Sequence, residues 1–330
     1  MSETKTVVNP EVYPLIFKPL VKARVWGGRR LQEEFGREPL DPLVPCGESW
    51  EIVDLPGESC VVAGGSLQGV TLTTLIKRHK KWLMGKASLL NGRFPLLLKL
   101  LDARETLSVQ VHPDEAAARR LGSSPKTEAW VVLDVQPGGC LYLGLRERAT
   151  PKAVRMACED NSLEKLLCRV EVKPMDVVYI PAGTVHAIGG GLLLAEMQQA
   201  SDTTYRLYDW GRMGLDGKPR PLHIEEALES IDFDFKEDPP WRPRRALGKV
   251  VESPAFIMEI ADLKDGEEYE VRVDCPVCAM CLVGAVAVSC GSKDVALQRG
   301  GVSLSPAAAG KTVFRGFSGG NSKVLVSRPL

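Results

Sequence analysis

Two short stretches decide the fold of this chain, Leu107-Ser108-Val109-Gln110-Val111-His112-Pro113-Asp114 and Val177-Val178-Tyr179-Ile180-Pro181-Ala182-Gly183-Thr184-Val185-His186. In the first stretch polar and β-branched residues alternate. A strand here would place Ser108, Gln110 and His112 on one face and the two valines on the other. Three polar side chains that point into the interior of a β-protein are costly unless they bind something.

The second stretch begins as a buried strand and ends in a Pro-x-Gly turn followed by a histidine. Gly183 permits the tight turn, and His186 then starts the return strand and points back toward the interior. A carboxylate, Glu128, lies at the entry to another expected strand, in Lys126-Thr127-Glu128-Ala129-Trp130. The sequence therefore predicts one divalent-metal site made of His112, Glu128 and His186, with Gln110 as a fourth ligand.

The ligand types restrict the metal without fixing it. Zinc accepts two imidazoles, a carboxylate and an amide oxygen, and it can leave a position open for water or substrate. Iron and manganese also tolerate this set. The chain has only two further histidines, His79 and His223, and we interpret both as ordinary core or surface residues.

Composition excludes several classes of partner. Among 330 residues, Lys+Arg and Asp+Glu are both 42, so no net basic field favours nucleic acid. Residues 1–11 are polar and lack the apolar core of a signal peptide, and no apolar run is long enough to span a membrane. Nine cysteines, an odd number without an export signal, indicate reduced thiols and a cytoplasmic protein.

Cys275, Cys278 and Cys281 have a spacing that is also found in iron–sulfur loops. The residues that follow, Met280 to Val288, form a nearly continuous apolar run that we expect to be one buried strand. Cysteine behaves as a small hydrophobic residue in such a strand, so we favour a core role for these thiols.

Strand signals dominate, without the regular intervening helices that a parallel sheet requires. Strands are expected at 50–53, 107–112, 129–135, 140–143, 168–172, 177–180, 192–198 and 203–208, and helices at 72–83, 114–121, 151–167 and 223–231. Proline-rich and charged residues 236–248 are the best candidate for a linker. We expect a polar N-terminal arm (1–13), a catalytic domain with helical segments (14–235), this linker, and a C-terminal β domain (249–330) that contains no histidine.

Pro-x-Gly-x-x-His resembles the second half of the cupin signature, and the wider pattern is similar to a narrower family. The short bacterial form of type I mannose-6-phosphate isomerase (phosphomannose isomerase) resembles this chain at Phe94–Lys99, Leu107–Asp114, Lys126–Trp130, Ile180–Gly189, Glu196–Asp209, Trp26–Gly28 and Gly47–Glu51. One departure is Met175-Asp176, where the family usually has Gly-Asp, and we expect the turn to be rebuilt there.

The resemblance implies a mainly β fold of two cupin-type (jelly-roll) barrels, with a small helical portion attached to the first and no metal ligands in the second. It also implies a zinc enzyme of carbohydrate metabolism, with one Zn²⁺ per chain, that interconverts mannose 6-phosphate and fructose 6-phosphate through a cis-enediolate. By this match Gln110, His112, Glu128 and His186 are metal ligands, Arg206 is catalytic, and Ser108 and Lys99 bind the phosphate. Further cleft residues are Lys126, Glu196, Asp202, Glu48 and Trp26.

Several alternatives stay open. Glu196 is the first candidate for the proton-transferring base and Lys126 the second. Arg206 and Asp202 are four residues apart and could instead form an ion pair. A metal-binding cupin without turnover, or a cupin oxygenase with ferrous iron, are the competing functions. The expected partner is a small sugar phosphate, with no nucleic acid and no membrane, and the chain is expected to be a monomer or a small homo-oligomer.

Overall fold

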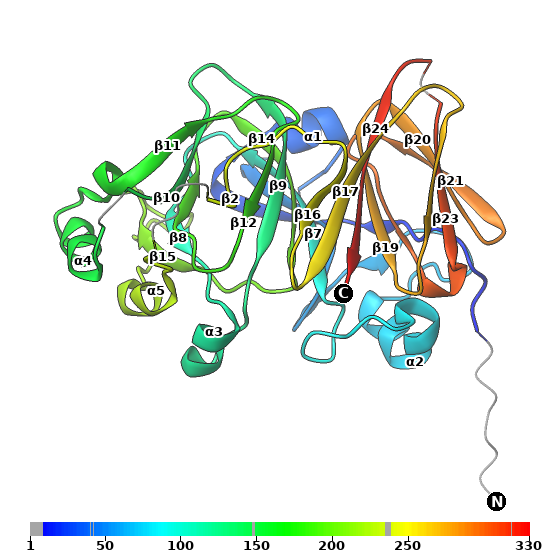
Figure 1. Ribbon diagram of the computed structural model, residues 1–330, viewed down its shortest axis with the longest axis horizontal. Helices are drawn as coiled ribbons and strands as arrows, with labels where there is room; N and C mark the ends of the chain where they lie inside the picture. The colour runs from blue at the N-terminus through cyan, green and yellow to red at the C-terminus, as the bar shows by residue number, and fades with distance from the viewer. Residues whose placement is uncertain (1–8, 40, 42, 147–148, 235–238, 318) are drawn as a thin grey trace, which may run out of the picture. The chain divides into compact units, whose positions relative to one another are not determined.

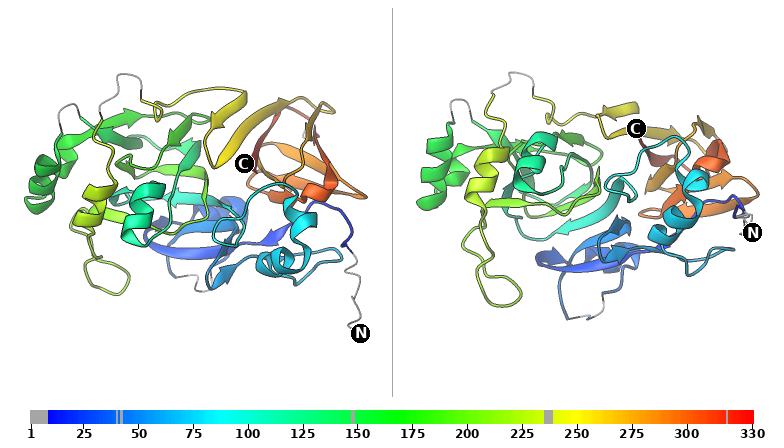
Figure 2. Two further views of the ribbon diagram at one scale, coloured as in Figure 1. Left: turned by 60° about the horizontal axis from the view of Figure 1, so that its bottom comes forward. Right: turned by 90° about the horizontal axis from the view of Figure 1, so that it is seen from below.

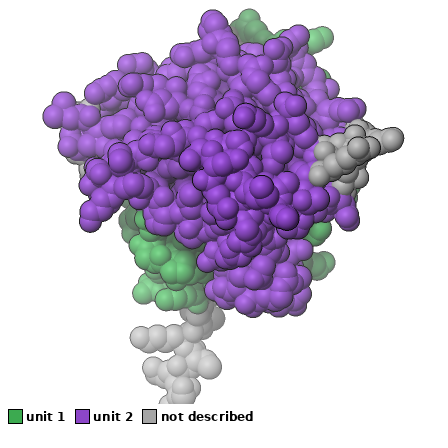
Figure 3. All heavy atoms as spheres, turned by 90° about the vertical axis from the view of Figure 1, so that its left-hand side faces the viewer, with its two compact units in different colours: residues 1–19, 52–95, 247–330 green, residues 20–51, 96–246 purple. Residues whose placement is uncertain are grey.

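The protein is described here by a computed structural model that covers residues 9–39, 41, 43–146, 149–234, 239–317 and 319–330. Most of the expected N-terminal arm and residues 236–238 of the expected linker lie outside these residues. The chain packs into two compact units, coloured separately in Figure 3. Unit 1 contains residues 1–19, 52–95 and 247–330, and unit 2 contains residues 20–51 and 96–246. The domain boundaries expected from the sequence stay a prediction.

Unit 2 contains two antiparallel sheets (Figure 1). The order of the six-stranded sheet is β12 (Val177–Ile180), β9 (Glu128–Val135), β14 (Leu192–Gln199), β7 (Leu96–Ala103), β2 (Leu20–Gly28) and β3 (Cys46–Ile52). The order of the five-stranded sheet is β11 (Leu167–Glu171), β10 (Cys140–Leu145), β13 (His186–Ile188), β8 (Val109–Val111) and β15 (Tyr205–Tyr208). A buried core that includes Leu101 and Trp130 from the first sheet and Leu141 and Ile188 from the second lies between them.

The helices of unit 2 pack on the strands from outside. They are α1 (Arg30–Phe35), α3 (Glu115–Leu121), α4 (Pro151–Glu159), the short 3-10 helix η1 (Leu163–Leu166) and α5 (Ile224–Ser230). Val154 of α4 and Ala227 of α5 share a buried cluster with Val109 and Val111 of β8. These two helices therefore cover the outer face of the five-stranded sheet, as the views in Figure 2 show.

Unit 1 also consists mainly of two sheets. One has the order β16 (Gly248–Glu252), β17 (Phe256–Leu263), β24 (Ser322–Pro329), β19 (Val277–Val283) and β22 (Val302–Ser305). The other has β18 (Glu268–Arg272), β23 (Lys311–Gly316), β20 (Ala285–Cys290) and β21 (Lys293–Gln298). Two short pairs, β1 (Phe17–Lys18) with β6 (Val61–Val62) and β4 (Asp54–Leu55) with β5 (Glu58–Ser59), accompany helix α2 (Leu72–Met84) and the 3-10 helix η2 (Ala307–Ala309).

The strands and helices expected from the sequence are confirmed to within a few residues. Strands β2 and β7, helix α1 and the two short strand pairs β1–β6 and β4–β5 have no counterpart among the elements expected from the sequence. Strand β7 is buried along its whole length, so its sequence shows no alternation of apolar and polar residues. The mainly β class is confirmed. No helix within the described ranges is long and apolar enough to cross a membrane.

One sequence expectation about local structure is wrong. The run from Met280 to Val288 is not one strand, because Gly284 adopts φ +68° and separates β19 from β20, which belong to different sheets. Met175 adopts φ +72°, in the left-handed region that favours glycine, and the expectation that this turn differs from that of the family stays a prediction.

The core role of the C-terminal cysteines holds for two of the three. Cys278 and Cys281 are buried in β19, whereas Cys275 is half-buried before the strand. Burial raises the pKa of the Cys278 thiol well above its usual range, so this thiol stays protonated. The three thiols do not form a metal-ligand group among the residues that the structure describes.

Candidate active site around a buried histidine–glutamate cluster

His112, Glu128 and His186 form a buried cluster in unit 2. One potential ligand atom from each lies within 4.8 Å of the others. Glu128 Oε2 is 3.4 Å from His112 Nε2, and Glu128 Oε1 is 3.2 Å from His186 Nε2. Glu128 begins a strand of the six-stranded sheet, whereas His186 begins a strand of the five-stranded sheet. The cluster therefore lies between the two sheets.

The backbone fixes the tautomer of both imidazoles. His112 Nδ1 lies 2.8 Å from the carbonyl oxygen of Thr203, and His186 Nδ1 lies 2.9 Å from that of Thr184. A carbonyl only accepts, so each Nδ1 carries a proton, and each ring in its neutral form presents the lone pair of Nε2 to Glu128. Burial, and then the charge of Lys126, lower the pKa of His112 to about 3, which keeps this ring neutral at pH 7.

This arrangement fits a cation. A carboxylate and two unprotonated Nε2 atoms are all acceptors, so their close approach is unfavourable unless positive charge lies among them. Lys126 supplies part of it, because its Nζ lies 3.1 Å from His112 Nε2 and 2.8 Å from Glu128 Oε2. Although burial acts to raise it, the charge of Lys126 holds the pKa of Glu128 well below its usual range. The donor set and the backbone-fixed tautomers are those of metal-binding histidines.

Gln110 completes the cluster. Its side-chain amide nitrogen lies 3.2 Å from His186 Nε2, and its amide oxygen accepts from Ser108 Oγ at 3.4 Å. A half-turn of the amide exchanges the two atoms and directs the oxygen at the cluster. Gln110 pairs with His186 in the β8–β13 register, which explains how two residues far apart in the sequence meet. The expected strand faces are observed, with Val109 and Val111 packed on the opposite side.

The Pro-x-Gly turn positions His186 as expected. Gly183 adopts φ +88°, and an added Cβ would lie 3.1 Å from Asp232 Cβ. Its amide nitrogen donates to the carbonyl of His112 at 2.8 Å, and its carbonyl accepts from Asp232 N at 2.9 Å. The turn thus ties the loop before β13 directly to the residue that carries the other imidazole.

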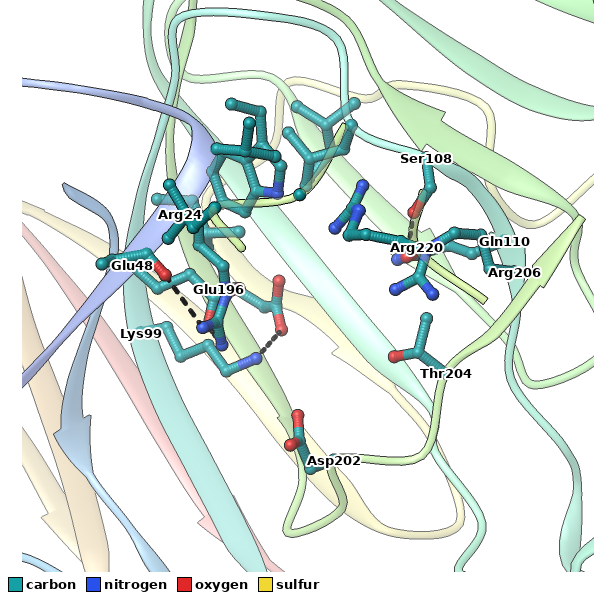
Figure 4. Close-up of a pocket in the computed structure, with 18 of the residues that line it drawn as sticks. Arg24, Glu48, Lys99, Ser108, Gln110, Glu196, Asp202, Thr204, Arg206 and Arg220 are labelled. Atoms are coloured by element: carbon teal, nitrogen blue, oxygen red, sulfur yellow. Dashed lines mark hydrogen bonds and ion pairs between the residues drawn. The ribbon is translucent and has the colours of Figure 1, made fainter. Parts of the chain in front are cut away.

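A cavity of about 530 Å³ opens beside the cluster, entirely within unit 2 (Figure 4). Ten of the twelve residues proposed from the sequence line it, and the other two are the buried histidines. The ten are Trp26, Glu48, Lys99, Ser108, Gln110, Lys126, Glu128, Glu196, Asp202 and Arg206. Sequence reasoning missed Arg24, Thr204, Asp216 and Arg220, which also line the cavity. No local motif marked them.

One wall of the cavity contains charges that compensate one another. Lys99 Nζ lies 3.3 Å from Glu196 Oε1, and both side chains are almost fully buried. Glu48 accepts two hydrogen bonds of 3.1 Å from Arg24 and one of 2.6 Å from Trp50 Nε1. Burial acts to raise the pKa of Glu48, but Lys99 and Arg24 outweigh it and lower the value to about 2.

Burial and the charges of neighbouring groups both act on the pKa values of Glu196 and Lys99, but a different one of the two prevails at each residue. Burial raises the pKa of Glu196, and the charge of Lys99 opposes that rise without cancelling it. Burial acts to lower the pKa of Lys99, but Glu196 and Glu48 together raise it. Lys99 is therefore a firmly charged partner beside a carboxylate with an increased proton affinity.

Ser108, Gln110, Arg206 and Arg220 lie on the other side of the cavity in Figure 4. Arg206 Nη1 donates to the carbonyl of Pro221 at 2.8 Å. The alternative of an ion pair between Arg206 and Asp202 is not observed between these two described residues, and Asp202 is exposed at the cavity rim.

A metal-ligand cluster beside a polar cavity with buried acid–base groups defines a class: a metal-dependent enzyme that acts on a small polar molecule. The family model "Phosphomannose isomerase type I, catalytic domain" matches residues 15–129. Mannose-6-phosphate isomerase ManA from Bacillus subtilis (strain 168) is 42% identical over 221 residues, which cover 66% of this chain and 68% of that protein. The mannose-6-phosphate isomerase of Streptococcus mutans is 38% identical over 248 residues, which cover 74% and 77%.

The fold agrees with these matches. The crystal structure of the mannose 6-phosphate isomerase from Bacillus subtilis superposes with a TM-score of 0.81 at 29% identity, covering 96% of this chain and 99% of that one. The chain belongs to the type I mannose-6-phosphate isomerase family, a family of aldose–ketose isomerases.

Proposed function

We propose that this protein interconverts mannose 6-phosphate and fructose 6-phosphate through a cis-enediolate. The observation that carries the proposal is the acceptor cluster of His112, Glu128 and His186 beside the Lys99–Glu196 pair in one cavity. It offers a cation site and a buried carboxylate, which are the parts that a proton transfer between adjacent carbons needs. The relatives named above support the choice of substrate.

We propose one zinc ion per chain, held by Gln110, His112, Glu128 and His186. Neutral imidazoles, a carboxylate and an amide oxygen suit zinc, although the donor types alone also accept iron and manganese. A bound divalent ion supplies Lewis acidity that stabilises negative charge on the substrate oxygens by several kcal/mol.

We further propose that the paired sheets of each unit are cupin-type barrels, with the metal ligands in the first and none in the second. Helices α3, α4 and α5 would be the helical portion of the first barrel. The domain limits proposed from the sequence (14–235 and 249–330) accompany this interpretation, and so do a cytoplasmic location and a monomer or small homo-oligomer.

Glu196 is our proposed base. The isomerisation moves a proton from C2 to C1, and burial gives the Glu196 carboxylate the raised proton affinity that such a step uses. Lys126 is less suited, because its ammonium already donates to His112 Nε2 and pairs with Glu128 Oε2. Lys126 would instead hold positive charge beside the ligands.

Arg206 would donate to the oxygen that becomes negative in the enediolate, since a guanidinium stays charged and presents several donors. Its Nε is buried and has no hydrogen-bond partner within the described ranges, so this donor is available. Ser108 and Lys99 keep their proposed contact with the phosphate. The Lys99 ammonium is shared with Glu196, whereas Ser108 gives Gln110 only a long hydrogen bond of 3.4 Å.

The test is metal-dependent turnover. Chelator-treated protein is reconstituted with zinc, manganese or ferrous iron, and the fructose 6-phosphate formed from mannose 6-phosphate is measured. We expect activity to disappear with chelation and to return best with zinc. Absence of turnover at every metal loading would reject the isomerase and leave a metal-binding cupin without catalysis.

A further inference from the structure

We propose that Gln198 is a positioning residue for the metal site and that it acts through the loop that orients His112. The inference deepens the proposed function and rests on it, because it concerns one of the proposed zinc ligands. Gln198 lies near the end of β14, where it pairs with Glu128 of β9. Its side chain is fully buried and is not among the described residues that line the cavity.

Residues 200–204, here called the crossing loop, lead from β14 in one sheet of unit 2 to β15 in the other. Asp202 and Thr204 of this loop line the cavity (Figure 4). Between them, the carbonyl of Thr203 accepts from His112 Nδ1 at 2.8 Å. A partner of this kind fixes the ring orientation of a metal-binding histidine. The path of the crossing loop therefore decides how the imidazole is held.

The amide of Gln198 holds the start of the crossing loop at two points. Its Nε2 donates to the carbonyl of Gln199 at 2.8 Å and to that of Ser201 at 2.7 Å. The Gln199 carbonyl also accepts from Ser201 N at 2.7 Å, so the chain makes a sharp three-residue turn around the amide. Ser201 Oγ in turn accepts from Thr203 N at 3.2 Å. A continuous set of hydrogen bonds thus leads from Gln198 to the residue that holds His112.

The partners of the Gln198 amide decide its orientation. Two carbonyls can only accept, so the amide nitrogen faces them and Oε1 points the other way. That oxygen is buried and has no hydrogen-bond partner within the described structure. An unpaired buried acceptor is unfavourable, and an apolar side chain of similar size would avoid it. The amide therefore contributes through its two donors rather than by filling space.

Other hydrogen bonds hold the crossing loop independently of Gln198. The backbone of Gln199 donates to the carbonyl of Thr127 at 3.0 Å, and its side-chain oxygen accepts from Thr127 N at 2.9 Å. Ser201 Oγ donates to the carbonyl of Ser124 at 3.2 Å. Loss of the Gln198 donors should therefore loosen the loop without unfolding the protein.

The experiment compares Gln198→Met, which fills a similar space without donors, with Ser253→Ala. Ser253 is the matched control, because it is also buried and also holds a backbone turn, but in unit 1: its Oγ donates to the carbonyl of Phe256 at 2.9 Å. We expect Gln198→Met to raise the Kd for zinc, measured by competition with a chelator, by about 10-fold. Ser253→Ala should lower the Tm and leave the Kd for zinc unchanged.

A second measurement does not depend on metal. In metal-free protein labelled with ¹⁵N-histidine, NMR reports how fast the Nδ1 proton of His112 exchanges with water. A proton bonded to a buried carbonyl exchanges slowly, so we expect exchange to be about 10-fold faster or more in Gln198→Met and unchanged in Ser253→Ala. If Gln198→Met does not fold, Gln198→Glu takes its place, because a carboxylate has the same shape and no donor. That variant is judged on exchange alone, since its added charge would itself attract a cation.

The route of the effect is tested with Ser201→Ala, which removes the hydroxyl between Ser201 and Thr203. If Gln198 acts along this path, the double variant should raise the Kd for zinc by less than the product of the two single effects. Effects that simply multiply would overturn the proposed path.

A folded Gln198→Met protein with a lower Tm, but with unchanged zinc affinity and unchanged Nδ1 exchange, overturns the inference and leaves the isomerase standing. Conversely, a wild-type protein that binds no zinc and shows no turnover rejects the proposed function. The exchange rate of the His112 proton then decides by itself whether Gln198 positions this ring.

Discussion

The two units are built from the same kind of element and fill their interiors in opposite ways. Between the sheets of unit 2 lie two imidazoles, a carboxylate and the Lys99–Glu196 pair. The corresponding interior of unit 1 contains Val286, Val288 and Phe314 and no metal-ligand group among its described residues. Buried polar groups cost free energy unless each has a partner. The difference shows that the described interior of unit 2 holds ionisable groups whose burial costs stability, whereas the described core of unit 1 is mainly apolar.

The largest expected effect on this difference between the units comes from removing one of the proposed metal ligands of unit 2. His186→Ala is expected to lose the bound metal and to lower kcat by about 10³-fold or more, because the charge stabilisation by the ion disappears. Metal content and fructose 6-phosphate formation measure the effect. His79→Ala, in helix α2 of unit 1, is the control and should retain both. Equal losses in the two variants would contradict the assignment.

Arg206→Ala separates charge stabilisation from metal binding within unit 2. The variant should keep its metal and lose about 10²–10³-fold in kcat, since a donor to the developing negative charge is removed. Steady-state kinetics and metal analysis are made on the same preparation. Turnover near that of wild type would show that Arg206 has no such role.

The buried charges of unit 2 should make the free energy of unfolding depend on pH in the acid range. The pKa of Glu48 is lowered from 4.5 to about 2, so its stabilising contribution is complete above pH 4.5 and is lost as the pH falls toward 2. Glu48→Gln should therefore lower the free energy of unfolding by about 3 kcal/mol at pH 7 and by about half of that near pH 3. Denaturant unfolding at the two pH values measures this. The exposed Glu225→Gln should show little change at either pH, and an equal effect of Glu48→Gln at both would refute the charge network.

A smaller effect tests the apolar interior of unit 1. Cys278→Ser places a hydroxyl where the structure has a fully buried thiol, and we expect a loss of about 1–3 kcal/mol in stability. Kinetic constants and metal content should stay at wild-type values, because this thiol is not a ligand. Cys278→Ala separates the loss of volume from the burial of a polar group. Loss of metal from Cys278→Ser would mean that the cysteines have a function after all.

The smallest expected effect is a gain. Met175→Gly removes a side chain from a left-handed backbone position, with φ +72°, and should raise the free energy of unfolding by about 0.5–1 kcal/mol. The gain is limited because glycine also increases the entropy of the unfolded chain. Activity should not change. A loss of stability would show that the side chain of Met175 outweighs the backbone strain.

The sequence reveals those parts of the fold and site that are governed by local periodicity. Alternation from Ser108 to His112 predicts the shared strand face, and the Pro-x-Gly turn predicts the position of His186. Periodicity does not predict strand β7, because its residues are buried on both faces and apolar and polar residues do not alternate. It also misreads the run of Met280 to Val288, because a single glycine, Gly284, redirects the chain into a second sheet.

The electrostatic partners could not be predicted for a different reason. The pairing of Lys99 with Glu196 depends on the register of β7 and β14, which joins residues 97 positions apart. Arg220 and Asp209 are separated by a loop without periodic pattern, so no spacing rule connects them. The sequence reports which chemical groups are present, and only the tertiary fold decides which charges compensate one another.

The carbonyls of Thr203 and Thr184, which hold the Nδ1 protons of the two imidazoles, belong to the main chain. Every amino acid provides the same carbonyl, so replacement of either threonine leaves the acceptor in place as long as the backbone path is kept. The orientation of the two Nε2 atoms toward Glu128 therefore does not depend on the side chains at positions 184 and 203. Substitutions of these two threonines that keep the backbone path should therefore leave the tautomers of His112 and His186 unchanged.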